Sequence, residues 1–167
     1  AHGLIEEGAD LLDIGGESTR PGAAAPPADE EIRRIVPVLD ALRDCGLPLS
    51  VDTRRAETMR VALEHGADLV NDIGALRAPG AIDAVRGSDC AVCLMHMQGE
   101  PGTMQQQPKY GDVVGEVEDF LAGRVAAAVE NGIARERIVV DPGIGFGKTL
   151  RHNLQLLAAL DELAALA

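Results

Sequence analysis

Short β-like runs alternate with helical patterns along this chain, and this alternation constrains the fold more than any other feature. The runs occupy residues 10–15, 47–52, 68–73, 90–96 and 138–141. A strand followed by a helix and then by another strand needs a crossover connection, which places consecutive strands parallel in one sheet. The sequence therefore predicts an α/β fold with about five parallel strands.

Helical periodicity fills the intervals between these runs. The first clear pattern starts near Asp29 and repeats apolar residues every three or four positions as far as Leu42. Pro37 falls inside this pattern and is expected to kink the helix or loosen the preceding turn. Further helical patterns are predicted over residues 4–8, 59–66, 81–85 and 113–132, and from residue 154 onward.

Polar residues stand at the carboxyl ends of the β-like runs, namely Asp13, Asp52, Asn71 with Asp72, His96 and Asp141. In a (β/α)₈ barrel every strand ends at one mouth and contributes to one site, whereas a doubly wound sheet uses mainly the crevice at its switch point. Contributions from all runs favour the TIM barrel. A complete barrel takes ~250 residues, so residues 1–167 are expected to form a single, incomplete barrel domain, cut at both ends.

The net charge disfavours some classes of binding partner, and the cysteine content indicates the cellular compartment. The net charge of −12 disfavours nucleic acid and anionic membranes, and no apolar stretch approaches the ~20 residues of a membrane helix. Cys90 and Cys93 lie in one apolar run, where residues three apart point to opposite faces of a strand. They are predicted to be reduced, buried thiols, which favours the cytoplasm.

Two glycine-rich loops follow the first and last runs. Residues 15–22 read GGESTRPG and fit a ligand-binding loop and a plain strand–helix connection about equally well. Residues 141–149 read DPGIGFGKT but do not form a Walker A motif, because Pro142 stands where the first glycine is required. This second loop presents an aromatic ring, Phe146, and a cation, Lys148, beside Asp141.

Asp52, Asn71 and Asp141 are the strongest candidates for a binding site. Strand-end carboxylates and a carboxamide that face one cavity could hydrogen-bond a heterocycle with amino and ring N–H groups, and buried carboxylates without partners are costly. The alternative for Asp52 is structural, since Asp52 or Thr53 could cap a helix that begins at Arg54. The histidines lack the spacing of a zinc site, so no metal ligands are predicted.

Taken in order, several motifs resemble one enzyme family, dihydropteroate synthase. They are GGESTRPGA, SVDT, ADLVNDI, CLMHMQGEPGTMQ, PKYGDV and DPGIGFGKT. The resemblance runs from about Gly8 to Leu157, and GESTRPG, MHMQGEP and DPGIGFGK are each fairly specific. It implies a (β/α)₈ barrel that joins 6-hydroxymethyl-7,8-dihydropterin diphosphate to 4-aminobenzoate in folate biosynthesis and releases diphosphate.

The resemblance also implies roles for individual residues. The pterin ring would be held by Asp52, Asn71 and Asp141, with Ile73 and Met95 as apolar walls. Asp52 and Asp141 would stabilise the dihydropterin cation that forms when the bond to diphosphate breaks. The aminobenzoate side would be formed by Thr19, Arg20, Pro21 and Phe146.

The family uses Mg²⁺ with the diphosphate, is the target of sulfonamides and usually forms homodimers. Some of its structural features have no match in this chain. Its first strand with an Asn-bearing loop and its last two strands, which carry a substrate-contacting lysine and an Arg-x-His diphosphate site, are missing here. Lys148 is not that lysine, and the isolated chain is expected to be inactive.

Two alternatives to the synthase remain open. One is a pterin-binding methyltransferase that moves a methyl group from a folate to a corrinoid, although GESTRPG and Phe146 speak against it. The other is a non-catalytic module that holds a pterin without reacting it.

Overall fold

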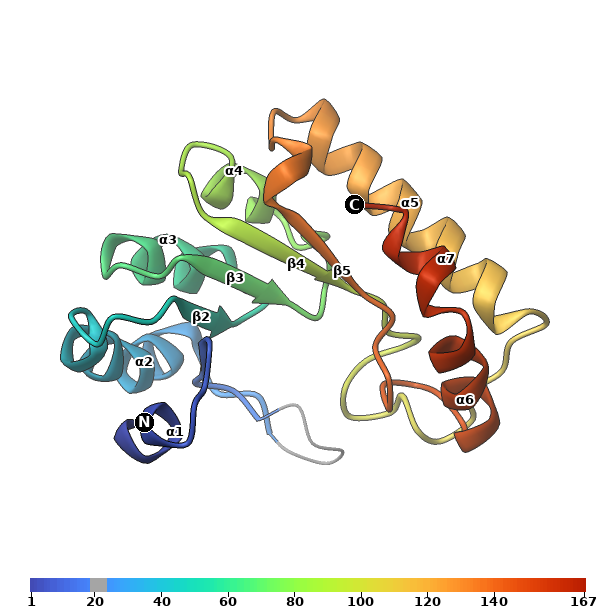
Figure 1. Ribbon diagram of the computed structural model, residues 1–167, viewed down its shortest axis with the longest axis horizontal. Helices are drawn as coiled ribbons and strands as arrows, with labels where there is room; N and C mark the ends of the chain where they lie inside the picture. Colours follow the sequence, from blue (N-terminus) through green and yellow to red (C-terminus); the bar gives the residue numbers. More distant parts are fainter. Residues whose placement is uncertain (19–23) are drawn as a thin grey trace.

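The computed structural model describes residues 1–18 and 24–167, and a single parallel sheet lies at its centre. Its strands are β1 (Leu12–Gly15), β2 (Leu49–Asp52), β3 (Leu69–Asp72), β4 (Ala91–Met95) and β5 (Ile138–Asp141). Each strand pairs with the next one along the chain, in the order β1-β2-β3-β4-β5 (Figure 1). The predicted α/β fold with five parallel strands is confirmed.

Helices follow the strands as the periodicity predicts. They are α1 (His2–Glu6), α2 (Ala28–Leu42), α3 (Ala56–Glu64), α4 (Ala81–Val85), α5 (Val113–Glu130), α6 (Leu150–Ala158) and α7 (Leu160–Ala164), with a 3₁₀ turn, η1 (Arg135–Arg137), before β5. Helix α2 runs on across Pro37. The last pattern begins earlier than predicted because Thr149 caps α6, accepting a hydrogen bond from the backbone N–H of His152. No helix in the described ranges is both long and apolar enough to span a bilayer.

The predicted alternative role of Asp52 as a helix cap is wrong. Helix α3 begins at Ala56, and its N-cap is Arg55. The hydroxyl of Thr53 accepts a hydrogen bond from the backbone N–H of Arg55 at 3.2 Å, which makes a side-chain turn ahead of the helix. The side chain of Asp52 therefore does not cap α3 and belongs to the end of strand β2.

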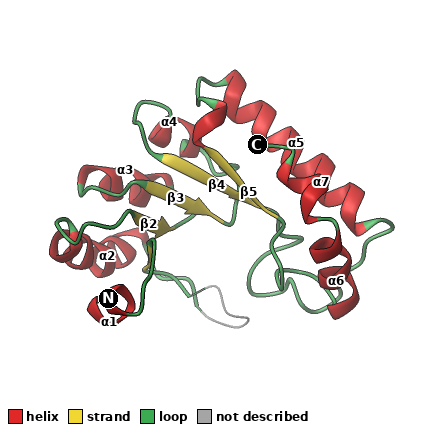
Figure 2. Ribbon diagram, in the orientation of Figure 1, coloured by secondary structure: helices red, strands yellow, loops and turns green. Residues whose placement is uncertain are grey.

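Strand register divides the sheet into two chemically different faces. Residues that pair directly between parallel strands point to the same side, so Gly15, Asp52, Asn71 and Cys93 form one row. The opposite face is apolar and packs against α2, α3, α4 and α5, which follow one another along the outside of the sheet in Figure 2. We call the face that carries the row the inner face. It is the more polar of the two.

Asp72 lies next to Asn71 in sequence but belongs to the helix-covered face, where it organises a strained turn. Its two carboxylate oxygens accept the backbone N–H groups of Gly74 at 2.6 Å and Leu76 at 2.7 Å. Ala75 and Leu76 have φ values of 52° and 55°, a left-handed conformation that costs energy in residues with a Cβ. The Arg124 guanidinium donates to the Ala75 carbonyl at 2.7 Å and holds the turn from α5.

Replacing Asp72 by asparagine is expected to lower the free energy of unfolding of the full-length gene product by about 2 kcal/mol. The amide keeps one acceptor oxygen, so one of the two backbone N–H groups loses its partner in a fully buried position. Urea denaturation measures the change. Asp83→Asn, which removes an exposed carboxylate of α4, is the matched control and should shift stability by less than about 0.5 kcal/mol. Equal shifts in the two variants would contradict the proposed turn function of Asp72.

Candidate functional site

The three polar residues singled out in the sequence lie at the same end of the sheet on its inner face. Asp52 pairs directly with Asn71. Asp141 lies on β5, the next strand but one from Asn71, and pairs with Met95 of β4. The Asn71 amide donates a hydrogen bond to the Asp13 carboxylate at 3.2 Å. Asp13 therefore joins this group, and we call these four residues the polar cluster. Their assignment to a ligand remains a prediction.

Asp52 is the most perturbed carboxyl group of the polar cluster. Burial raises its pKa to about 7, and the negative charges of neighbouring carboxylates, with Asp13 the largest contributor, act in the same direction. Burial also raises the pKa of the Cys93 thiol to about 12, helped by Asp141 and then Asp13. The cluster thus concentrates acceptor oxygens in a partly desolvated place. Such a site favours a ligand that brings N–H donors or positive charge.

Cys90 and Cys93 do not form a pair of thiols at this site. Cys90 is buried on the helix side, whereas Cys93 stands in the inner row between Asn71 and Val139. Both are free thiols, and they point to opposite faces as strand alternation predicts.

An apolar wall adjoins the polar cluster. Ile73 and Met95, the predicted walls, pack in one cluster with Met97 and Met104, and Phe146 packs against them. The structure therefore brings together three residues that the sequence assigned to two different substrate sides. A flat ring lying against this wall would have the acceptor groups of the polar cluster along one of its edges.

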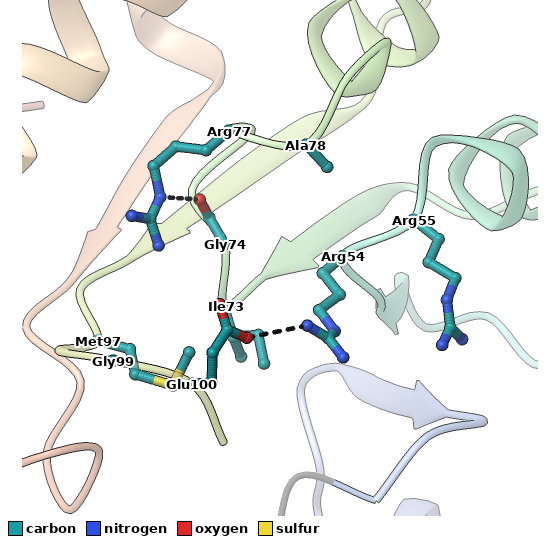
Figure 3. Close-up of a pocket in the computed structure, with 9 residues that line it drawn as sticks. All are labelled: Arg54, Arg55, Ile73, Gly74, Arg77, Ala78, Met97, Gly99 and Glu100. Carbon is teal, nitrogen blue, oxygen red and sulfur yellow. Dashed lines mark hydrogen bonds and ion pairs between the residues drawn. The ribbon is translucent and has the colours of Figure 1, made fainter. Parts of the chain in front are cut away.

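A cavity is lined by residues of the loops that follow β2, β3 and β4. It has a volume of about 460 Å³, and its lining includes Ile73, Met97 and three arginines, Arg54, Arg55 and Arg77 (Figure 3). None of Asp52, Asn71 or Asp141 lines it. The cluster instead lies on the open inner face, because five strands do not close around it. The candidate site is therefore the polar cluster with its apolar wall, and the cavity shares Ile73 and Met97 with that wall.

The base of the first glycine-rich loop is held by a network of ion pairs. Glu17 pairs with Arg54 at 2.9 Å and with Arg55 at 3.1 Å, and Arg55 pairs with the fully buried Glu31 at 2.6 Å. Gly16 packs so closely on Glu31 that an added Cβ would lie 2.8 Å from its Cγ. Thr19, Arg20 and Pro21, the predicted aminobenzoate residues of this loop, lie outside the described residues.

A bound metal ion has no ready ligand set in the part of the chain that the structure describes. No group of three or more His, Cys, Asp or Glu residues there could hold an ion. Asp141 already accepts the backbone N–H of Gly143 at 2.7 Å, and Asp13 accepts from Asn71. The described residues therefore do not fit a Mg²⁺ site by themselves.

Two features of the site were not predicted from the sequence. Asp13 was noted as a strand-end residue but not assigned to the site. The rule that residues two apart on a strand share a face could have linked it to Gly15 and so to Asp52. The other feature is the burial of Lys148, which has no local signal because its partner His96 is 52 positions away.

Comparison with known proteins places the chain among enzymes that bind pterins. The family model described as "Pterin binding enzyme" matches residues 1–167. Dihydropteroate synthase of Neisseria meningitidis serogroup C is 51% identical over 167 residues, which cover 99% of this chain and 59% of that protein. This chain thus spans somewhat more than half the length of that relative.

Solved structures agree with this result. Burkholderia cenocepacia dihydropteroate synthase complexed with 7,8-dihydropteroate superposes with a TM-score of 0.91 at 57% identity, over 97% of this chain and 59% of that one. Xanthomonas albilineans dihydropteroate synthase with 4-aminobenzoic acid gives a TM-score of 0.89 at 55% identity, over 97% and 58%. The five strands match part of the barrel of these enzymes, so the predicted partial TIM barrel and the resemblance are both confirmed.

Proposed function

Because the chain belongs to the pterin-binding enzyme family, we propose that its full-length gene product is a dihydropteroate synthase. The reaction joins 6-hydroxymethyl-7,8-dihydropterin diphosphate to 4-aminobenzoate, giving 7,8-dihydropteroate and diphosphate. The observation that carries this proposal is the polar cluster: Asp52 and Asn71 lie side by side on adjacent strands, with Asp141 on the same face and an apolar wall beside them.

The pterin would lie flat against Ile73 and Met95 with its N–H groups toward the polar cluster. Ionised Asp52 and Asp141 each offer acceptor oxygens, whereas Asn71 can both accept and donate. Asp141 has one oxygen engaged by Gly143, which fixes the carboxylate and leaves the other oxygen for a ligand. Complementary donors and acceptors along one edge would select a pterin over a plain aromatic ring.

The same carboxylates suit the bond-breaking step. When the C–O bond to diphosphate breaks, its electron pair leaves with the diphosphate and the dihydropterin becomes cationic. Fixed negative charge in a partly desolvated site stabilises that cation. The amine of 4-aminobenzoate then forms the new C–N bond and loses a proton. Mg²⁺ would accompany the diphosphate, but the described residues offer it no ligand set, so nothing above depends on it.

The aminobenzoate side of the proposal rests on Phe146 and on the loop that contains Thr19, Arg20 and Pro21. Phe146 lies against the apolar wall and would provide an aromatic face for the second substrate. Glu17, at the base of the loop, is fixed by two arginines, so the loop starts from a defined place beside the polar cluster. We further propose that the full-length protein is a cytoplasmic homodimer.

The proposed reaction is tested by incorporation of labelled 4-aminobenzoate. The full-length gene product, given dihydropterin diphosphate and Mg²⁺, is expected to form labelled dihydropteroate. A folate-to-corrinoid methyltransferase would instead transfer a methyl group and incorporate no label. A non-catalytic module would bind the pterin without turnover. Either of these two results would overturn the proposal.

A further inference from the structure

Lys148 is a buried cation that the proposed mechanism does not use. Its side chain is only 3% exposed, and it is one of two lysines in the sequence, with Lys109 the other. Its ammonium group has three partners: the Nδ1 atom of His96 at 3.0 Å, the His96 carbonyl at 3.2 Å and the Phe146 carbonyl at 3.0 Å. Three donors thus meet three acceptors. Burial lowers the pKa of Lys148 to about 8, and the charge of Asp141 acts against this shift, so the ammonium form predominates at pH 7.

His96 is set up to accept from this ammonium group. Burial lowers the pKa of His96 to about 4, and the nearby charge of Lys148 acts in the same direction. The ring is therefore neutral at pH 7, so Nδ1 accepts and the ring proton is on Nε2. The rings of His96 and Phe120 make a T-shaped contact at a centroid distance of 4.9 Å, and the backbone N–H of His96 donates to the Asp141 carbonyl at 2.9 Å.

The loops after β4 and β5 form one closely packed unit around this lysine. A Cβ added to Gly143 would lie 1.9 Å from the His96 carbonyl oxygen, and one added to Gly147 would lie 2.7 Å from that of Gln98. Both glycines also have positive φ values, 69° and 62°. The Tyr110 hydroxyl donates to the Gly147 carbonyl at 3.1 Å. The backbone of the loop after β5 can therefore approach that of the loop after β4 only because Gly143 and Gly147 have no side chains.

We propose that Lys148 is a positioning residue that ties the β4 loop to the β5 loop and thereby fixes the ring of Phe146 for the second substrate. It bonds the carbonyl of Phe146 itself, and the Phe146 ring packs on the wall formed by Ile73 and Met95. Lys148 touches neither substrate in this arrangement. The part that concerns the aromatic amine rests on the proposed function, whereas the tie between the loops does not.

Lysine fits this place better than methionine or arginine, the side chains of most similar length. Methionine would occupy a similar volume but would leave two buried carbonyl groups and the His96 Nδ1 atom without a donor. Arginine would bring a planar fork, whose donors diverge and do not converge on three acceptors around one point. Loss of the ammonium group should therefore loosen the two loops without emptying the core.

The test compares Lys148→Met with Lys109→Met in the full-length gene product. In Lys148→Met, the KM for 4-aminobenzoate is expected to rise about 10-fold, while kcat and the pterin Kd change by less than about 3-fold. Amide hydrogen exchange over residues 96–99 and 143–149 should become faster. Lys109→Met, which leaves the two loop backbones unchanged, should alter none of these quantities by more than about 2-fold.

Several results would overturn the proposal. A large loss of kcat at unchanged KM would assign Lys148 to the chemical step, and unchanged exchange would show that it does not tie the loops. If Lys148→Met does not fold, acylation of wild-type lysines with an amine-reactive reagent still decides: Lys109 should react and Lys148 should be protected. Equal labelling would refute the tie between the loops. Exchange and labelling are independent of turnover, so they separate a failure of this inference from a failure of the synthase assignment.

Discussion

Replacing Asp52 by asparagine is expected to lower the affinity of the full-length gene product for the dihydropterin by about 1000-fold. The carboxylate can accept two N–H groups of the ring, whereas the amide keeps one acceptor and turns an NH₂ group toward a donor. Each hydrogen bond to a charged group contributes about 1.5–3 kcal/mol, so losing one and adding a repulsive contact accounts for the size of the effect. Isothermal titration calorimetry with the unreacted dihydropterin measures it.

The pH dependence of binding provides a second test of the same residue. With its pKa raised to about 7, Asp52 is half protonated near neutral pH before the ligand binds. Only the ionised form accepts two N–H groups, so affinity should rise as the pH increases from about 6 to 8, and binding should release protons. The Asp52→Asn variant should lose this dependence.

The unliganded protein should respond to pH in the opposite sense. The folded-state pKa of Asp52 lies above its ordinary value of 3.8, so the native state holds this proton more tightly than the unfolded chain does. The contribution of Asp52 to stability is therefore fully present below pH 3.8 and is lost as the pH rises through about 7. Pterin binding at pH 8 would offset that loss.

Asp44→Asn is the matched control for these measurements. Asp44 is an exposed carboxylate in the turn after α2, before the amino end of β2, whereas Asp52 stands at the carboxyl end of that strand. Its replacement removes one negative charge without touching the sheet and should leave pterin affinity within about 2-fold of wild type. Wild-type affinity in Asp52→Asn, or an equal loss in Asp44→Asn, would remove Asp52 from the pterin site.

Much of the fold could be predicted because strand and helix periodicities are local. Each predicted β-like run contains the observed strand, and the errors are confined to the ends, as with residues 10–15 against Leu12–Gly15. The start of the last helix was missed because it depends on a reciprocal cap between Thr149 and His152 and not on apolar spacing. Ends are decided by single hydrogen bonds, which periodicity does not contain.

The site could be predicted only to the extent that residues at strand ends can be recognised in the sequence. Asn71 and Asp72 both end β3, and the sequence predicts Asn71 for the site but leaves the role of Asp72 open. Alternation sends Asn71 to the polar cluster and Asp72 to the strained turn on the other face. Burial of Lys148 depends on the approach of two loops joined through Gly143, a long-range contact that no local pattern encodes. Long-range contacts therefore set the limit of prediction here.

The isolated 167-residue chain is expected to show no detectable dihydropteroate formation. Within the described residues, β1 and β5 each pair on one side only, so the sheet stays open and no further strand closes over the polar cluster. Val139 on the inner face of β5 is 48% exposed, and Leu11 beside β1 is 40% exposed. An open site cannot exclude water from a cationic intermediate, and unpaired strand edges favour aggregation. The labelled-aminobenzoate assay and size-exclusion chromatography of residues 1–167 provide the measurements.

A fusion protein distinguishes two causes of inactivity, an incomplete barrel and a defective site. In the fusion, residues 1–167 replace the matched segment of the Neisseria meningitidis relative, which is 51% identical to them. The relative then supplies the remaining strands, and turnover should return because the polar cluster is closed over. The same fusion carrying Asp52→Asn should stay inactive. Turnover by residues 1–167 alone would show that an open five-stranded sheet suffices for catalysis. An inactive but folded fusion would instead mean that the polar cluster of this chain cannot support the reaction.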